Sequence, residues 1–129
     1  MKWLERFSNE VYALLRIMTG FMFLFHGAQK ILRIFAEGMP VFPVGSQAWW
    51  GGIIELVGGI AILLGFQTRL AAFICSGMMA VAYFQFHWKF QMGRSFFPVV
   101  NQGELAVLYC FVFLLIACRG GVKWCMDKK

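Results

Sequence analysis

The sequence predicts an all-α integral membrane protein, a four-helix bundle with both termini in the cytoplasm. Two observations support this fold class. Of the 129 residues, 60% are hydrophobic and only 14% are charged, whereas soluble domains carry about 25% charged residues. The apolar residues gather in long runs and do not alternate as barrel strands do, and isolated strands could not satisfy their backbone in lipid. We therefore expect helices that have lipid as their solvent.

Four apolar segments approach the roughly 20 residues that a helix needs to cross the hydrocarbon core. The first is interrupted by Arg16, and the second starts at the interfacial pair Trp49 and Trp50. A tight turn at Thr68 separates the second from the third, and the short fourth segment ends before Arg119. We predict a single membrane domain over residues 1–129, with helices at about 11–34, 49–66, 70–87 and 104–118.

Lysine and arginine residues flank these segments unequally. The side that holds both termini would carry seven of them and the other side four. Because cytoplasmic loops carry the excess of basic residues, this predicts cytoplasmic termini. The basic residues lie at the ends of apolar runs and form no face of their own. The net charge of +6 therefore indicates contact with the anionic surface of a lipid bilayer and not with nucleic acid.

Several ionisable residues fall within or beside the predicted helices, and such residues are functional candidates because their burial in a membrane is costly. Helical spacing places His26 on the polar stripe of the first helix and Glu55 on a glycine-rich face of the second. His87 and Glu104 fall at the outer ends of the third and fourth helices. Their depths predict one polar cluster in the outer half of the bundle. The candidate ligand-binding residues are His26, Glu55, His87, Glu104, Tyr83, Asn101 and Lys30.

Three interpretations of this cluster remain open. It can be structural, with Glu55 paired to Lys30 or His26. It can be a pocket for a quinone, because His and Glu side chains hydrogen-bond quinone oxygens and aromatic walls suit a flat ring. It can be a metal site, since His and carboxylate ligands suit iron, copper or zinc. The Glu-x-x-His pattern of di-iron bundles is absent from the sequence, and no metal ligand is assigned.

The cysteines bear on the redox chemistry that such a site could support. The four cysteines, at positions 75, 110, 118 and 125, form no Cys-x-x-Cys pair. A membrane enzyme that exchanges electrons between a quinone and a dithiol needs a close cysteine pair. The spacing therefore argues against a dithiol enzyme within this chain.

Two arginines and two glycine pairs receive structural interpretations. Arg16 lies near the inner boundary of the first helix, and we expect its side chain to extend to the lipid headgroups. Arg69, in the tight turn, is expected to be a cytoplasmic anchor. The glycine pairs at 51–52 and 58–59 are predicted to be helix-packing faces, because small residues let neighbouring backbones approach closely.

Motifs along most of the chain, from about residue 15 to residue 121, resemble the DoxX family. The similar runs are 15–20 (LRIMTG), 25–30 (FHGAQK), 50–55 (WGGIIE), 64–69 (LGFQTR), 79–84 (MAVAYF) and 101–104 (NQGE). Gln102 departs from the family pattern, which has Gly-Gly before the glutamate. The resemblance implies a four-helix protein of a bacterial inner (plasma) membrane. The family takes its name from a subunit associated with a terminal quinol oxidase, and some members are linked to membrane oxidoreductase complexes.

The leading hypothesis is a redox-associated accessory subunit, or a small quinone-interacting protein, whose polar pocket lies in the outer half of the bundle. This hypothesis favours a quinone as the cofactor. It is compatible with a homo-oligomer or with membership in a membrane redox complex. The alternative is a non-catalytic structural or assembly partner of a larger membrane complex. A small transporter is the weakest hypothesis, because the chain has no inverted repeat or broken helix pair.

Overall fold

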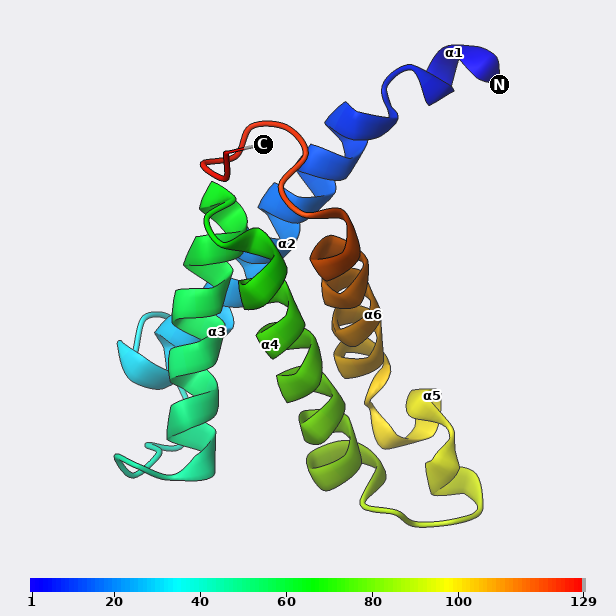
Figure 1. Ribbon diagram of the computed structural model, residues 1–129. Helices are drawn as coiled ribbons and strands as arrows, with labels where there is room; N and C mark the ends of the chain where they lie inside the picture. Colours follow the sequence, from blue (N-terminus) through cyan, green and yellow to red (C-terminus); the bar gives the residue numbers. More distant parts are fainter. Residues whose placement is uncertain (129) are drawn as a thin grey trace.

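A computed structural model describes residues 1–128, and every regular element in them is a helix (Figure 1). The four longest helices account for most of the chain, and the others are short pieces at the N-terminus and in the connection before the last helix. The elements are α1 (Lys2–Glu5), α2 (Ser8–Ile31), α3 (Gln47–Leu64), α4 (Thr68–Ala82), the π-helix η1 (Tyr83–Trp88), the 3₁₀-helix η2 (Arg94–Phe96), α5 (Pro98–Asn101) and α6 (Glu104–Arg119).

The bounds of the helices follow from local capping. α3 begins after Ser46, whose Oγ accepts a hydrogen bond from the N–H of Trp49 at 3.2 Å, as N-cap residues do. It ends at Gly65, which has a φ of 68° and can adopt this left-handed conformation without strain. α2 begins and ends three residues earlier than the predicted 11–34, and the third helix continues through η1 to Trp88.

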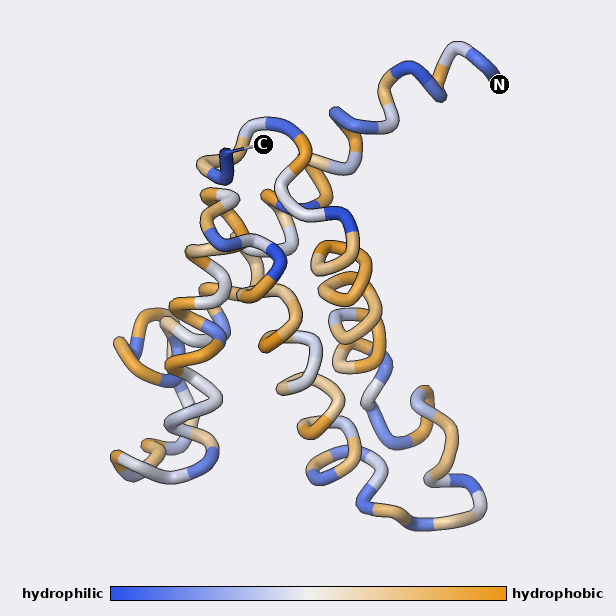
Figure 2. The backbone as a smooth tube through the Cα atoms, in the orientation of Figure 1, coloured by the Kyte–Doolittle hydropathy of each residue, from blue (hydrophilic) through white to orange (hydrophobic). Residues whose placement is uncertain are grey.

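Three helical segments are long and apolar enough to cross a membrane: Ser8–Ile31, Gln47–Leu64 and Thr68–Trp88. α6 has 16 residues and is thus about 24 Å long, against about 30 Å for a hydrocarbon core. The outward faces of the helices carry exposed aromatic and aliphatic side chains such as Phe73, Leu108 and Phe111, and apolar residues cover the helices in Figure 2. The fold is that of a multi-pass helical membrane protein, in which a fourth span by α6 stays a prediction.

The helices form two antiparallel pairs. α2 packs mainly on α3, α4 packs mainly on α6, and a short turn at residues 65–67 joins the pairs. Both ends of the described chain lie at the same end of the bundle, which we call the terminal end (Figure 1). The connections 32–46 and 89–103 lie at the opposite end, the loop end. This arrangement agrees with termini on one side of a membrane but does not identify that side.

Glycines bring the backbones of α2 and α3 together. A Cβ added to Gly27 would lie 2.3 Å from the backbone N of Leu56, and one added to Gly20 would lie 2.5 Å from the N of Leu63. From the other helix, a Cβ on Gly59 would lie 2.5 Å from the N of Leu24. Along this crossing, the two helices therefore contact each other through small residues and backbone atoms, and not through interdigitated side chains. The predicted packing role of the glycine pair 58–59 is confirmed, since Gly58 also lies against Cys75.

Aromatic side chains close the core between the two pairs. Phe23 of α2 reaches the buried face of α6, where its ring centroid lies 4.6 Å from that of Phe113 and 5.3 Å from that of Tyr109. Ile62, Ala72 and further residues complete the same buried cluster. α2 therefore contacts α6 mainly through side chains, while it contacts α3 backbone to backbone.

Candidate functional site

A partly buried ion pair lies between α2 and α3 in the half of the bundle nearer the loop end. Lys30 Nζ lies 2.7 Å from Glu55 Oε1, and Glu55 is 6% exposed. Gly52, one turn before Glu55, makes this contact possible, because a Cβ there would lie 2.9 Å from the Cβ of Lys30. Of the two partners that the sequence suggested for Glu55, the structure shows Lys30 and not His26.

The second carboxylate oxygen of Glu55 has no partner. Oε2 is buried and accepts no hydrogen bond from the residues that the structure describes. A buried ionised carboxylate with one unsatisfied oxygen is costly, and such an atom in a native structure needs an explanation. A donor from outside the chain would satisfy it.

Glu55 and Lys30 face a cleft of about 250 Å³. Its other walls come from the connection after α2, from α3 and from the α4–η1 helix, and they are mostly apolar. The remaining lining residues are Phe42, Gln47, Ala48, Gly51, Met78, Val81, Ala82 and Phe86. This combination of apolar walls with a few convergent polar groups is typical of sites for small molecules.

The cleft continues into an apolar groove on the outer side of the α3–α4 seam. The groove measures about 380 Å³ and shares Gly51, Met78 and Val81 with the cleft. Trp50 and Phe73 also line it. Because these side chains face the region where lipid would lie, a ligand could reach Glu55 laterally along the membrane.

A second polar group joins the end of η1 to the loop before α6. The Asn101 side chain donates to Tyr83 Oη at 3.2 Å and to the carbonyl of Ser95 at 2.9 Å. His87 Nδ1 lies 3.3 Å from the carbonyl oxygen of Asn101. The π-helix places Tyr83 and His87 here, and π-helical turns occur often at functional sites. The observed bonds give these three residues a positioning role for the loop.

The other two predicted site residues do not line the Glu55 cleft. His26 is exposed on α2 and faces a groove of about 540 Å³ between α2 and α6. Its ring stands edge-on to that of Tyr109, with 6.3 Å between the centroids. Glu104 is the exposed first residue of α6. Within residues 1–128, the predicted cluster is thus divided into separate groups, of which Lys30 with Glu55 lines the cleft.

Arg16 has a role that the sequence interpretation missed. Its side chain is 0% exposed and donates to the carbonyls of Ile62 at 2.6 Å and Leu63 at 2.9 Å, at the end of α3. It also donates to the carbonyls of Lys123 at 3.0 Å and Trp124 at 2.6 Å. The expectation that Arg16 extends to lipid headgroups is wrong, because its two terminal nitrogens donate to carbonyls inside the protein.

The position of Arg16 on α2 could have indicated that its side chain is buried. Arg16 shares a stripe with Thr19, Gly20 and Phe23, all of which are buried. Residues that are three, four and seven positions apart lie on one face of a helix. An arginine on the packed stripe therefore points into the bundle.

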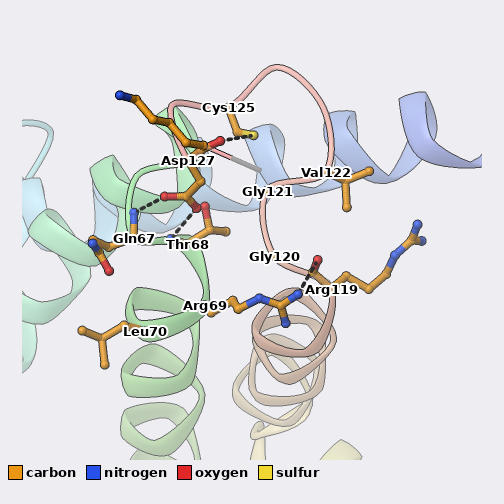
Figure 3. A pocket seen from close by; sticks show the side chains of 11 residues that line it. Gln67, Thr68, Arg69, Leu70, Arg119, Gly120, Gly121, Val122, Cys125 and Asp127 are labelled. Carbon is orange, nitrogen blue, oxygen red and sulfur yellow. Dashed lines mark hydrogen bonds between the residues drawn. The ribbon is translucent and has the colours of Figure 1, made fainter.

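The residues after α6 fold back over the terminal end (Figure 3). Tyr12 Oη donates to the carbonyl of Gly120 at 2.7 Å. Asp127 accepts hydrogen bonds from the backbone N–H groups of Gln67 at 2.7 Å and Thr68 at 2.9 Å, at the start of α4. Arg69 donates to the carbonyls of Ala117 at 3.0 Å, Cys118 and Arg119 at the end of α6. We call residues 120–128 the C-terminal strap.

Electrostatics favour the Asp127 contact. Burial alone would raise the pKa of its carboxyl group. The hydrogen bonds from Thr68 and Gln67 and the charge of Arg16 outweigh that effect and lower the pKa below its ordinary value of 3.8. Asp127 is therefore ionised at neutral pH, where it complements the positive end of α4.

The fold defines a multi-pass α-helical membrane protein, in which Lys30 and Glu55 line a small cleft. The chain belongs to the DoxX family, whose family model matches residues 11–88, and the resemblance found in the sequence is confirmed. It is also similar to an uncharacterized protein of Haemophilus influenzae, to which it is 39% identical over 136 aligned positions that cover 100% of this chain and 97% of the relative. No solved structure matches it.

Proposed function

We propose that this DoxX-family protein is a small quinone-interacting protein of a bacterial inner membrane that serves redox physiology as an accessory subunit. The observation that carries the proposal is an apolar cleft lined by Glu55, whose buried Oε2 has no partner among the described residues. A quinol hydroxyl would donate to the carboxylate of Glu55, and a quinone carbonyl would accept from Lys30. The ion pair thus offers one acceptor and one donor to the two redox forms of the same ring.

The dimensions of the cleft support a ring with its isoprenoid chain outside. A volume of about 250 Å³ is below the range of about 300–1,000 Å³ for drug-sized ligands. The adjoining groove of about 380 Å³ along α3 and α4 would take the first part of the chain. In this proposal, Tyr83, His87 and Asn101 position the loop end, while His26 and Glu104 lie outside the ring site.

The proposed orientation rests on the distribution of lysine and arginine. With the termini in the cytoplasm, the terminal end faces inward and the cleft opens in the outer half of the membrane. A quinone bound there would lie on the side where protons are exchanged with the periplasm.

Replacement of Glu55 tests the proposal. Glu55→Gln should weaken binding of a short-chain benzoquinone about tenfold or more, because a hydrogen bond to a charged group contributes about 1.5–3 kcal/mol. Binding to the purified protein can be followed by quenching of tryptophan fluorescence, since Trp50 lines the adjoining groove. Glu104→Gln is the matched control, because this glutamate is exposed and does not line the cleft. Equal binding by folded Glu55→Gln and wild type would refute the quinone site.

A second candidate function is that of an assembly partner without a ligand. The observation that favours it is the length of α6, which at 16 residues is short for the hydrocarbon core. Short spans can be accommodated by oligomerisation. Purification in mild detergent separates the two functions: a stoichiometric polypeptide with an empty cleft favours assembly, and a bound quinone that is lost in Glu55→Gln favours the quinone site.

A further inference from the structure

A second cavity lies at the terminal end of the bundle, far from the functions proposed above. It measures about 690 Å³ and lies between the start of α4, the end of α6 and the C-terminal strap (Figure 3). None of its lining residues lines the Glu55 cleft. The side chains that matter for its chemistry are Thr68, Arg69, Arg119, Asp127 and Lys128.

The charges of this cavity favour an anion. Arg69, Arg119 and Lys128 line it, against the one carboxylate of Asp127. Both oxygens of Asp127 already accept backbone hydrogen bonds from the start of α4. A Cβ on Gly120 would lie 3.1 Å from Nε of Arg69, so the glycine keeps that edge of the guanidinium uncovered. The cations thus exceed the anions, although Arg119 also donates to Asn9 Oδ1 at 2.9 Å and stacks on the ring of Tyr12.

Thr68 adds a buried side chain to the polar lining. It is 0% exposed and lines the cavity, and its hydroxyl acts on the carboxylate of Asp127, whose pKa it helps to lower. The polar groups at the start of α4 are therefore directed at Asp127, and the basic side chains are the part of the lining that would bind an anion.

The cavity also borders an apolar groove. Gln67 and Leu70 line both the cavity and a groove of about 370 Å³ between α3 and α4. The groove runs toward the middle of the membrane-spanning region past Val57 and Ile74, and its lining is almost wholly apolar. A basic, polar cavity that continues into an apolar groove matches an amphiphile with an anionic head and a hydrocarbon chain. A free phosphate ion has no hydrocarbon chain that could occupy the groove.

We infer that this cavity binds the phosphate headgroup of an anionic phospholipid, with one acyl chain along the α3–α4 groove. Arg119 and Lys128 attract the phosphodiester, the Nε of Arg69 donates to one of its oxygens, and Leu70 contacts the start of the chain. Basic pockets between membrane helices are known to select such headgroups. The site would lie in the leaflet that contacts the terminal end.

The test compares phosphatidylglycerol with phosphatidylcholine as lipid probes. The purified full-length protein is titrated with each lipid, and bound lipid is resolved by native mass spectrometry. Wild type should prefer phosphatidylglycerol. The double variant Arg119→Gln/Lys128→Gln should lose affinity for it at least about fivefold, since one basic residue near an anionic surface contributes about that factor. The double variant Lys89→Gln/Arg94→Gln removes equal charge at exposed positions near the loop end and should bind like wild type.

Three results would overturn the inference. They are equal binding of the two lipids by wild type, equal losses in both double variants, and displacement of the lipid by millimolar inorganic phosphate, which would indicate a free anion as the ligand. If the first double variant does not fold, Lys128→Gln alone carries the test, because Lys128 is exposed and lines the cavity. Glu55→Gln should leave lipid binding unchanged, which separates this inference from the quinone proposal.

Discussion

The two ends of the bundle differ in how their helices are held together. At the terminal end, Arg16 donates to four backbone carbonyls, and the C-terminal strap ties α2, α3 and α4 together. Toward the loop end, α3 and α4 diverge (Figure 1), and Lys30 and Glu55 line a cleft. The difference indicates a division of labour, in which the terminal end fixes the helices so that the other half can keep an open cleft.

The largest expected effect comes from removing the guanidinium at the terminal end. Arg16→Met should destabilise the protein by about 3 kcal/mol or more, because it leaves buried carbonyls without donors and each hydrogen bond to a charged group contributes about 1.5–3 kcal/mol. Thermal unfolding in detergent measures the change. Arg6→Met is the control, since Arg6 is exposed before α2. A similar melting temperature for both variants would mean that the terminal end is not the rigid part of the molecule.

A smaller effect is expected at the α2–α3 crossing. Gly27→Ala should cost about 2 kcal/mol, within the range for overpacked cores, because its Cβ would lie 2.3 Å from the backbone N of Leu56. Gly77→Ala is the matched control, since a Cβ there meets nothing within 4 Å and alanine favours the helix. Unfolding of both variants in denaturant would show the contrast. If Gly27→Ala were as stable as Gly77→Ala, the backbone contact between α2 and α3 would not hold the first pair together.

The smallest effect concerns the pH dependence of the strap. The folded-state pKa of Asp127 is lowered, so its stabilising contribution is present above its ordinary pKa and is lost as the pH falls through the folded value. A carboxylate at a helix N-terminus contributes about 0.5 kcal/mol. Asp127→Asn should therefore lower stability by about that amount at neutral pH and remove part of the decline that occurs as the pH falls below the ordinary pKa of 3.8. Parallel declines in melting temperature for both proteins would assign the acid sensitivity to another group.

Much of the fold could be predicted from the sequence, because apolar runs and capping residues are local signals. The division of the polar cluster into separate groups could not be predicted from the sequence. Depth along each helix places His26 near Glu55, but successive residues of a helix differ by about 100° in direction. Gly27 faces α3, and its neighbour His26 therefore faces α6. The spacing of polar residues indicated their level in the membrane and left their side of the bundle undetermined.

The environment of Arg16 could not be predicted from the sequence for a different reason. Two of its acceptors, the carbonyls of Lys123 and Trp124, lie 107 and 108 positions away in a segment with no periodic pattern. Backbone carbonyls carry no side-chain signature, and so composition cannot indicate that a distant loop will receive a guanidinium. The stripe that contains Thr19 and Phe23 was the only local signal of burial.

The contact between Arg16 and the strap also has a consequence for biosynthesis. During translation, the helix that carries Arg16 enters the bilayer before the ribosome has added residues 123 and 124. Two of the acceptors of Arg16 are therefore absent when the helix is inserted. In a nascent chain that stops short of them, Arg16 would keep only the carbonyls of Ile62 and Leu63 as acceptors. The two hydrogen bonds to the strap thus make the full burial of Arg16 depend on completion of the chain.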